Sequence, residues 1–338
     1  MSRIIVDAFG GDNAPLCCIQ GAVMARRKWG MEISLVGDEQ AIRSCAAEQG
    51  ESLDGIDIIP ADGVIAMHDD PGEVLKSKKG CSMAEGLRRL AAGEGDAFVS
   101  AGSTGALVMG STFYVKRIPG IKRAALAVSM PTPKQPYLLI DSGANVECRP
   151  DMLQSFGIMG SVYMERVAGI ASPRVGLLNV GTEESKGGEL QHAAFALLKS
   201  SPVNLIGNVE ARDVPGGVCD VLVCDGFSGN VVLKLTEGAA SALFGMIKGV
   251  FLSGMAGKLA ALLVKKPMKA LKHTLDYREA GGAPLMGVRR PVIKAHGSSD
   301  AKAMMNAIYQ ASLFADSQAI ETITQAVAQA AGEGRDAE

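Results

Sequence analysis

Several short apolar runs of this chain end in glycines and small polar residues, the residue types that let a loop approach an anion. The clearest case is the run Val221–Cys224, which leads directly into the polar loop Asp225–Asn230. Four more loops of this kind follow apolar runs, at residues 7–12, 100–106, 141–145 and 179–187. Glycine lacks a Cβ, and the carboxyl ends of parallel strands meet at one edge of a sheet, so these loops predict a shared ligand crevice.

Phosphate is the ligand that such loops bind most economically, because helix N-termini and successive backbone N–H groups present donors to an anion. Gly102-Ser103-Thr104-Gly105 precedes a helix-compatible run, and so does Gly229 followed by Asn230. Each is equally compatible with an ordinary strand-to-helix turn. The P-loop, GxGxxG, HExxH and GxSxG signatures are absent, which disfavours an NTPase, a common dinucleotide enzyme, a zinc hydrolase and a serine hydrolase.

Two charged or titratable side chains lie in loops of the same kind. Lys186 follows an apolar run in a glycine-rich loop, where a solvated lysine is the alternative interpretation. His296 comes directly after the run 291–295. The four histidines share no spacing that would predict a metal site, so no metal is expected.

Composition narrows the class of protein. A chain of 338 residues buries roughly three quarters of its unfolded surface, so a large core is expected. With 34 basic against 36 acidic residues and 4% aromatic residues, nucleic acid binding is disfavoured. The seven cysteines form no CxxC pair, which predicts reduced thiols in a cytoplasmic protein. No uncharged apolar run reaches about 18 residues, so no segment is expected to span a bilayer.

Strand-like apolar runs alternate with helical stretches for most of the length. They lie at residues 3–7, 32–36, 56–60, 96–100, 124–129, 137–141, 174–180, 203–207, 219–224 and 291–295. This alternation predicts an α/β fold with a mainly parallel sheet covered on both faces. Residues 1–330 are expected to form a single unit with interleaved subdomains, and residues 331–338 a disordered tail.

Helix starts are visible in the sequence. Ser82 with Glu85 predicts a capping box, and Pro150 opens a helical segment that reaches about residue 168. Ser299 or Asp300 is expected to open the last long helix, which reaches about residue 330.

One segment departs from the pattern, because no acidic residue lies between Glu237 and Asp276. We expect an amphipathic helical hairpin over residues 238–275, with a turn near Gly254–Gly257 and a kink or an end at Pro267. Its candidate membrane residues are Lys258, Leu262, Leu263, Lys265 and Lys266. Two interpretations stay open: a core helix pair with solvated lysines, or contact with an anionic membrane surface or an acidic partner protein.

Taken in order, these loops resemble those of the phosphate acyltransferase family of bacterial phospholipid synthesis. The similar segments are residues 7–15, 67–83, 100–106, 141–145, 179–187, 207–213, 225–230, 281–284 and 293–297. Ser103 stands where the family usually has Asn, and Thr182 where it usually has Glu. The resemblance implies a Rossmann-like three-layer α/β/α fold related to isopropylmalate dehydrogenase and phosphotransacetylase, a homodimer, and no cofactor.

The resemblance also implies an activity: transfer of a fatty acyl group from acyl-[acyl-carrier-protein] to inorganic phosphate, giving acyl phosphate for phosphatidic acid and phospholipid synthesis. The implied partners are therefore acyl carrier protein and phosphate. A cytoplasmic location with loose association to the inner face of the cell membrane is implied as well, and a membrane-bound glycerol-phosphate acyltransferase would be a further partner there.

This reaction needs position and charge compensation rather than a covalent side-chain nucleophile, because a thiol with a pKa of about 8.5 leaves readily. We expect Lys186 to hold phosphate, Asn230 to donate to phosphate or to the thioester oxyanion, and His296 to protonate the thiolate. The other expected substrate contacts are Gly10, Gly11, Asp12, Gly102, Ser103, Thr104, Gly105, Asn145, Arg212, Asp225, Ser228 and Gly229. Of these, Arg212 could clamp phosphate with two hydrogen bonds, whereas Asp225 is expected to orient its loop.

Three alternatives stay open at this point. One is a phosphotransacetylase-like enzyme that uses acyl-CoA, and another is a dehydrogenase on a related fold. The third, from a different class, is a non-catalytic scaffold at the membrane whose glycine loops are mere turns.

Overall fold

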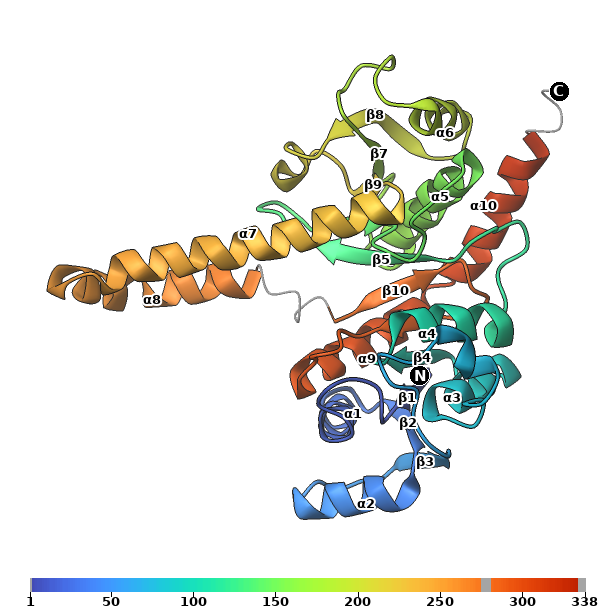
Figure 1. The fold of residues 1–338 in the computed structure, drawn as a ribbon, viewed down its shortest axis with the longest axis vertical. Helices are drawn as coiled ribbons and strands as arrows, with labels where there is room; N and C mark the ends of the chain where they lie inside the picture. Colours follow the sequence, from blue (N-terminus) through green and yellow to red (C-terminus); the bar gives the residue numbers. More distant parts are fainter. Residues whose placement is uncertain (1, 275–280, 334–338) are drawn as a thin grey trace.

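The backbone forms one mixed sheet that runs through the whole molecule (Figure 1). Its strands are β1 (Arg3–Asp7), β2 (Glu32–Gly37), β3 (Ile56–Pro60), β4 (Ala97–Ser100), β5 (Ala125–Met130), β6 (Tyr137–Ile140), β7 (Arg174–Asn179), β8 (Asn204–Glu210), β9 (Val221–Val223), β10 (Ala283–Met286) and β11 (Val292–Lys294). They follow the order β3-β2-β1-β4-β11-β10-β5-β6-β9-β7-β8. The structure is a computed structural model that describes residues 2–274 and 281–333.

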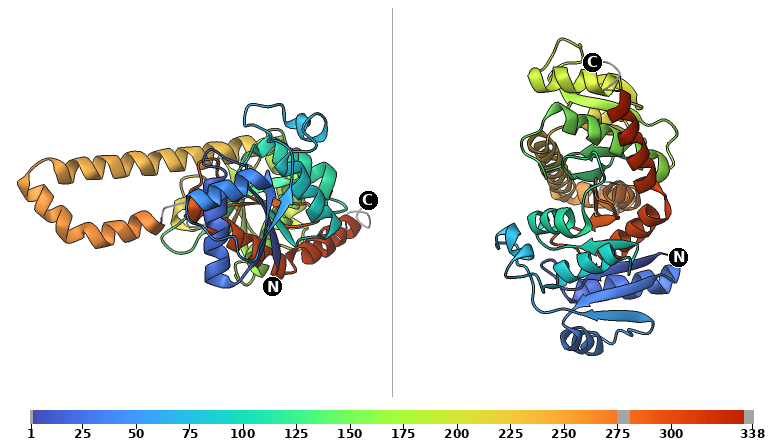
Figure 2. Two further views of the ribbon diagram at one scale, coloured as in Figure 1. Left: turned by 90° about the horizontal axis from the view of Figure 1, so that it is seen from below. Right: turned by 90° about the vertical axis from the view of Figure 1, so that its right-hand side faces the viewer.

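Helices cover both faces of this sheet (Figures 1 and 2). They are α1 (Leu16–Trp29), α2 (Glu39–Glu48), α3 (Ser82–Ala92), α4 (Thr104–Gly110), α5 (Pro150–Arg166), α6 (Glu189–Lys199), α7 (Gly226–Leu252), α8 (Met255–Thr274), α9 (Ala301–Asp316) and α10 (Ala319–Glu333). Short helical turns lie at η1 (Pro71–Leu75), η2 (Ser111–Val115) and η3 (Val214–Gly216). The predicted three-layer α/β fold is confirmed.

The sheet consists of two parallel halves joined by antiparallel strands. In the first half, β1, β2, β3, β4 and β11 are parallel to one another. In the second half, β6, β7, β8 and β9 are parallel. Between them, β10 is antiparallel to β11 and β5, and β5 is antiparallel to β6. Each half therefore gathers the loops at its strand carboxyl ends on an edge of its own.

All ten predicted strands are present, and one strand was missed. Strand β10 is only four residues long, contains Pro284 and follows Gly281 and Gly282, a composition typical of a loop. Its four residues are nevertheless fully buried, because β10 fills the space between the two halves. Burial between neighbouring strands thus overrides the local turn signal.

Two of the predicted helix boundaries are wrong in detail. Helix α3 begins at Ser82, but its N-cap is Cys81, and the Glu85 carboxylate pairs with Arg88 and Arg89 instead of closing a capping box. The last helical segment is two helices rather than one. Asp300 caps α9, which ends at Asp316, and α10 starts anew after Gln318, whose φ is 55°. Helix α10 reaches Glu333, inside the predicted tail, and residues 334–338 lie outside the described residues.

Helices α7 and α8 form a hairpin that projects away from the sheet (Figures 1 and 2). Its turn is at Ser253–Gly254, and Pro267 lies inside α8. The expected hairpin is present, although it starts at Gly226 and its predicted last residue, 275, lies outside the described residues. We call the two helices together the arm. The interpretation as a core helix pair is wrong for the single chain, because the arm leaves large apolar side chains exposed, among them Leu243, Met246, Val250, Leu259, Leu262 and Leu263.

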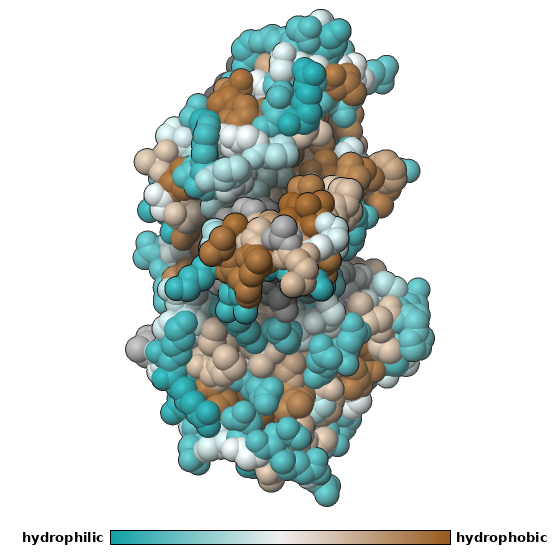
Figure 3. Space-filling view, turned by 90° about the vertical axis from the view of Figure 1, so that its left-hand side faces the viewer, coloured by the Kyte–Doolittle hydropathy of each residue, from teal (hydrophilic) through white to brown (hydrophobic). Residues whose placement is uncertain are grey.

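Figure 3 faces the end of the arm, where brown apolar side chains lie among teal polar ones. Helix α7 also contains an 18-residue window with mean hydropathy 1.3, none of which is buried. By length and composition alone this helix could cross a bilayer, and the expectation that no segment spans one stays a prediction.

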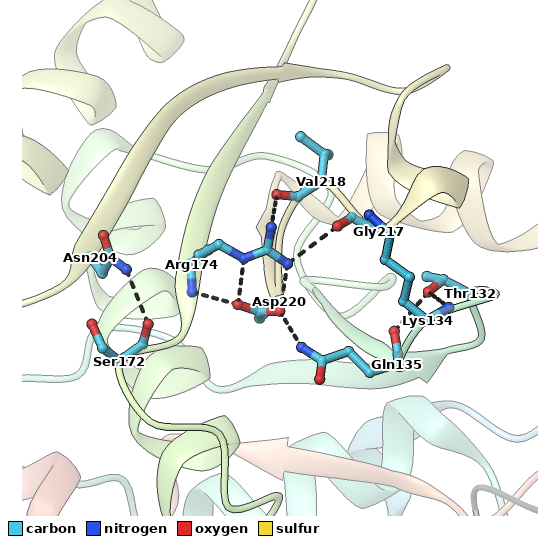
Figure 4. A network of polar contacts seen from close by, with 9 residues as sticks. All are labelled: Thr132, Lys134, Gln135, Ser172, Arg174, Asn204, Gly217, Val218 and Asp220. Atoms are coloured by element: carbon cyan, nitrogen blue, oxygen red, sulfur yellow. Dashed lines mark hydrogen bonds and ion pairs between the residues drawn. The ribbon is translucent and has the colours of Figure 1, made fainter.

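An ion pair between the buried carboxylate of Asp220 and the half-exposed guanidinium of Arg174 fixes the amino ends of the second-half strands (Figure 4). Asp220, just before β9, accepts from the guanidinium of Arg174 at 2.9 and 3.0 Å and from the backbone N–H of that residue at 2.8 Å. The Gln135 amide donates to the same carboxylate at 2.7 Å. Burial alone would raise the pKa of Asp220, but the hydrogen bonds from Arg174 dominate and lower it. The network ties β7, β9 and the loop before β6 together.

Asp220→Ala should lower the free energy of unfolding at pH 7 by about 2 kcal/mol, because Arg174 and Gln135 lose a buried partner. Asp213→Ala, which removes only an exposed pair at 4.0 Å, should change it by less than about 0.5 kcal/mol. Since the folded pKa of Asp220 is lowered, its stabilising effect is present above about pH 4 and is lost as the pH falls through the folded pKa. Chemical denaturation between pH 2 and 7 measures this; a difference that persists at pH 2 would contradict it.

Candidate functional site

Loops after β1, β4 and β11 meet at the first-half edge. Asp7 ends β1 and is buried, where it accepts from Ser100 Oγ at 2.7 Å and from the Phe9 N–H at 3.2 Å. Burial raises the pKa of Asp7, and bonds from Ser82 and Ser100 oppose this. A Cβ on Gly10 would lie 2.7 Å from both Asp7 Oδ2 and the Gly102 nitrogen, so only glycine fits there. Asp7 therefore anchors the two glycine loops to each other.

Lys294 is the residue at this edge that sequence reasoning missed. Its side chain is buried at the end of β11, and its ammonium donates to the carbonyls of Ala101, at 3.2 Å, and Ala295. Burial lowers the pKa of Lys294 to about 8, although the charges of Asp7 and Asp12 oppose the shift. The available signal was a lysine inside an otherwise apolar strand. It holds the loops after β4 and β11 together.

The predicted glycine loops of the first half lie on the same edge. Gly11 has φ 98°, and the Asp12 N–H donates to the Gly297 carbonyl at 2.8 Å, which joins the first loop to the loop of His296. Ser103 is the N-cap of α4, accepting weakly from the Ala106 N–H at 3.5 Å. Thr104 and Gly105 form the first turn of that helix. The structure thus brings Gly10, Gly11, Asp12, Gly102, Ser103, Thr104, Gly105 and His296 to one edge.

His296 is exposed in the loop after β11. Its Nδ1 accepts from the Ser298 N–H at 3.2 Å and lies 2.9 Å from the Ser298 hydroxyl. Partial burial of the ring, followed by the charges of Lys294 and Lys234, lowers the pKa of His296. Lys234 belongs to α7, so that helix passes close to the first-half edge.

At the second-half edge, the loop after β6 is built around Asp141. This fully buried carboxylate accepts from the N–H groups of Leu126, Gly143, Ala144 and Asn145 and from the Asn145 side-chain amide, at 2.7 to 3.2 Å. Burial raises the pKa of Asp141, and these donors oppose it. The Asn145 amide also donates to the Ala124 carbonyl at 2.8 Å. We expected Asn145 to donate to phosphate, but its side-chain amide instead donates to acceptors within the protein.

Helix α7 starts directly on this loop. Asp225 is its N-cap and accepts from both the N–H and the hydroxyl of Ser228 at 2.8 Å, so it orients the loop. The Gly226 N–H donates to the Asn145 carbonyl at 2.7 Å. A Cβ on Gly229 would lie 1.8 Å from the Asp141 carbonyl oxygen, so the helix can sit this close only with glycine there.

Asn230 lies in the first turn of α7, with its exposed side chain beside Gly143. A Cβ on Gly143 would be 3.7 Å from Asn230 Oδ1. The amide therefore faces the surface of the loop after β6, and nothing in the described residues takes up its donors. Of the predicted residues at this edge, Asn230 is the one most free to reach a ligand.

Lys186 and Arg212 lie at the same edge, in the loops after β7 and β8. The Lys186 carbonyl accepts from the Asn179 side chain at 3.0 Å, while its ammonium is exposed and makes no ion pair with the described residues. Arg212 instead pairs with Glu210 at 3.0 Å, so its guanidinium already has a carboxylate partner. The register of Leu177 with Val223 places the β7 and β9 ends side by side. Of the two cations, Lys186 is thus the one that has no carboxylate partner among the described residues.

The structure therefore gathers the predicted residues in two groups, one at each edge, with the first turns of α7 running between them. Within residues 2–274 and 281–333, no group of three His, Cys, Asp or Glu side chains could hold a metal ion. Two surface hollows, of about 330 and 520 Å³, lie elsewhere in the first half, beside Arg26 and beside Lys78. The hollow beside Lys78 includes Asp62 and Gly63, in the loop that follows the carboxyl end of β3.

Comparison with known proteins decides the family. The family described as "Fatty acid synthesis protein" matches residues 2–322. A phosphate acyltransferase of Alkaliphilus oremlandii is 46% identical over 325 residues, covering 96% of this chain and 97% of that protein. One from Oceanobacillus iheyensis is 47% identical, covering 96% and 97%. The chain belongs to the phosphate acyltransferase family. It is accordingly an acyltransferase, and the scaffold and dehydrogenase alternatives are wrong.

Solved structures share the fold of this family member at low sequence identity. The phosphotransacetylase EutD from Staphylococcus aureus matches with TM-score 0.62 and 16% identity, covering 93% of this chain and 94% of that one. A 4-hydroxythreonine-4-phosphate dehydrogenase from Klebsiella pneumoniae matches with TM-score 0.55 and 13% identity, covering 93% and 100%. The expected relation to the phosphotransacetylase fold is confirmed.

The buried amine of Lys294 should give the stability a distinct pH dependence. Its folded pKa, about 8, lies below the unfolded value of about 10.4, so the unfolded chain binds more protons between these values. The free energy of unfolding of the wild type should therefore rise from pH 8 to 10.5 relative to that of Lys294→Met. Parallel urea titrations of both proteins across this range measure the difference. Curves that stay parallel would show that the amine is not desolvated.

Proposed function

We propose that the chain transfers a fatty acyl group from acyl-[acyl-carrier-protein] to inorganic phosphate and so makes acyl phosphate for phospholipid synthesis. The observation that carries this proposal is the second-half edge, where two groups share one rim of the sheet. They are Asn230, in the first turn of α7, and the ammonium of Lys186, which forms no ion pair with the part of the chain that the structure describes. The name of the relatives, phosphate acyltransferase, supports phosphate as acceptor.

Acyl transfer from a thioester to phosphate needs few protein groups beyond these. Phosphate oxygen attacks the thioester carbonyl, the C–S bond breaks, and the thiolate leaves with a proton from solvent or a nearby acid. Lys186 would compensate the charge of phosphate, and the Asn230 amide and the α7 N-terminus would donate to phosphate or the oxyanion. Because its pKa is lowered, His296 is largely neutral at pH 7, which favours hydrogen bonding over proton donation.

The donor distinguishes this proposal from its alternative, a phosphotransacetylase-like enzyme that uses acyl-CoA. The fold cannot decide, because phosphotransacetylases and dehydrogenases share it. Acyl phosphate formation should be measured with phosphate and either acyl-[acyl-carrier-protein] or acyl-CoA. We expect a higher kcat/KM with the carrier protein. Product from acyl-CoA alone would favour the alternative, and no product from either donor would overturn the proposal.

We also propose a cytoplasmic homodimer that binds the inner face of the cell membrane through the arm, where a membrane-bound glycerol-phosphate acyltransferase could take the product. The exposed apolar side chains of the arm support this, as do its lysines, unaccompanied by acids from residue 238 to its end. The side chain of Leu262 is 69% exposed and that of Leu263 is 85% exposed, next to Lys265 and Lys266. Apolar burial and attraction to anionic lipid would act together there.

Lys186→Ala should reduce turnover roughly a hundredfold, since a charge contact to transferring phosphate contributes about 3 kcal/mol. Lys199→Ala is the matched control, because this exposed lysine lies on the neighbouring helix α6 and pairs with Glu184 at 3.2 Å. Both variants should keep the wild-type melting temperature. Steady-state kinetics test this, and a Lys186→Ala enzyme with near wild-type turnover would remove that residue from the site.

Asn230→Ala should lower kcat without unfolding the protein, and saturating phosphate should not restore it if the amide serves the transition state. Gly229→Val should instead destabilise the fold, because its Cβ would collide with the Asp141 carbonyl. Thermal melting combined with phosphate titration distinguishes the loss of a hydrogen-bond donor in Asn230→Ala from the loss of stability in Gly229→Val. Full rescue of Asn230→Ala by phosphate would assign the amide to ground-state binding.

The arm should bind vesicles that contain anionic lipid, and the binding should weaken as salt rises. Lys265→Glu with Lys266→Glu should reduce it at least tenfold, at about 1 kcal/mol per lysine. Leu262→Glu should reduce it even at low salt, because the apolar contact is lost. Co-sedimentation with anionic and with neutral vesicles measures the electrostatic and the apolar contributions to binding. Binding that neither change affects would show that the arm serves another contact.

A further inference from the structure

A second basic surface lies in the first half, away from the arm. No acidic residue occurs between Asp96 and Asp141 or between Glu279 and Asp300, so two long stretches contribute only positive side chains. Where these stretches meet, six cations are exposed: Lys116, Arg117, Lys122, Arg123, Arg289 and Arg290. We call these six side chains the basic rim.

Backbone contacts hold the two stretches against each other. The Ile118 N–H donates to the Gly287 carbonyl, and the Arg289 N–H donates to the Lys116 carbonyl, both at 3.0 Å. The Arg289 guanidinium donates to the Arg117 carbonyl at 3.1 Å, and the Arg117 guanidinium donates to the Lys122 carbonyl. The backbones that carry the basic rim are therefore held together, as are the guanidiniums of Arg117 and Arg289.

No cation of the basic rim has an acidic partner among the described residues. By contrast, Arg88 and Arg89 on the nearby helix α3 both pair with Glu85. Six like charges held close repel one another, and an anionic partner would relieve this repulsion. The large apolar residues of the same loops, Ile118, Ile121 and Val288, are buried. Since no apolar stripe accompanies the charges, the basic rim suits an acidic protein surface better than a lipid surface.

The basic rim borders the candidate site. Arg123 is followed by Ala124, whose carbonyl accepts from the Asn145 amide at 2.8 Å. The Asn145 carbonyl in turn accepts from Gly226, at the start of the helix that carries Asn230. We propose that the basic rim is the docking surface for an acidic carrier protein that presents the acyl thioester to the second-half edge. This inference rests on the proposed function, because it requires a protein-borne acyl donor.

Binding of fluorescently labelled acyl carrier protein to the full-length chain tests the inference, with fluorescence anisotropy as readout at low salt. Lys122→Glu combined with Arg123→Glu should raise the Kd at least tenfold, because two attractions become repulsions, and wild-type binding should weaken as salt screens the charges. Lys265→Glu with Lys266→Glu on the arm reverses the same number of charges and should leave the Kd within about twofold. Melting temperatures show whether each variant is folded. If the charge-reversed Lys122 and Arg123 variant is not folded, Lys122→Ala with Arg123→Gln takes its place.

Turnover with a small acyl-pantetheine donor separates docking from chemistry. The basic-rim variant should keep the wild-type kcat with this donor while its KM for acyl carrier protein rises. Unchanged carrier binding, an equal loss with both donors, or a larger effect of the arm variant would overturn the docking inference. If wild-type protein binds the carrier through the basic rim but forms no acyl phosphate, the proposed function fails and the docking surface stands.

Discussion

The buried carboxylate of Asp141 is the constraint on which the second half of the molecule depends. It accepts five hydrogen bonds, from the loop that it begins and from the start of β5. Those donors oppose the effect of burial, which raises the pKa of this carboxyl. With the loop fixed, the start of α7 packs against the carbonyls of Asn145 and Asp141. The helix can come this close only because Gly226 and Gly229 lack side chains. The position of Asn230 and the direction of the arm both follow from this contact between α7 and the loop after β6.

The first half has an analogous centre with a different chemistry. Asp7 and Lys294 are both buried at strand ends, and their opposite charges favour one another across the glycine loops. One centre thus relies on backbone donors around a carboxylate, the other on an amine that donates to carbonyls. Because the two halves are separated by the antiparallel strands β10 and β5, neither centre can reach the other edge. Helix α7 connects the two edges, because it starts at the second-half edge and its Lys234 acts on His296.

Strand positions were predictable because each strand is a short apolar run followed by a loop, and burial on both faces requires that composition. β10 was not, since Gly281, Gly282 and Pro284 give it the local signature of a turn and only its neighbours in the sheet bury it. The roles of single polar residues were harder still. Nothing in the sequence says that the Asn145 amide is used by Asp141 and Ala124. The apolar run around Lys294 signals a buried lysine but does not say which carbonyls its amine contacts. Those facts depend on which segments distant in sequence become neighbours.

The two lysine-rich surfaces of the chain differ in what accompanies the charge. On the arm, lysines alternate with exposed leucines, so a partner must accept apolar side chains and must also be anionic. Around the basic rim, Ile118, Ile121 and Val288 are buried and charge dominates the exposed surface, so a partner needs complementary charge and shape. A lipid surface meets the first condition and a folded acidic protein meets the second. Helix α7 starts at the loop that borders the basic rim and continues into the arm. One helix would therefore connect the docking surface of a soluble acyl donor to the membrane, where an acylated product is most soluble.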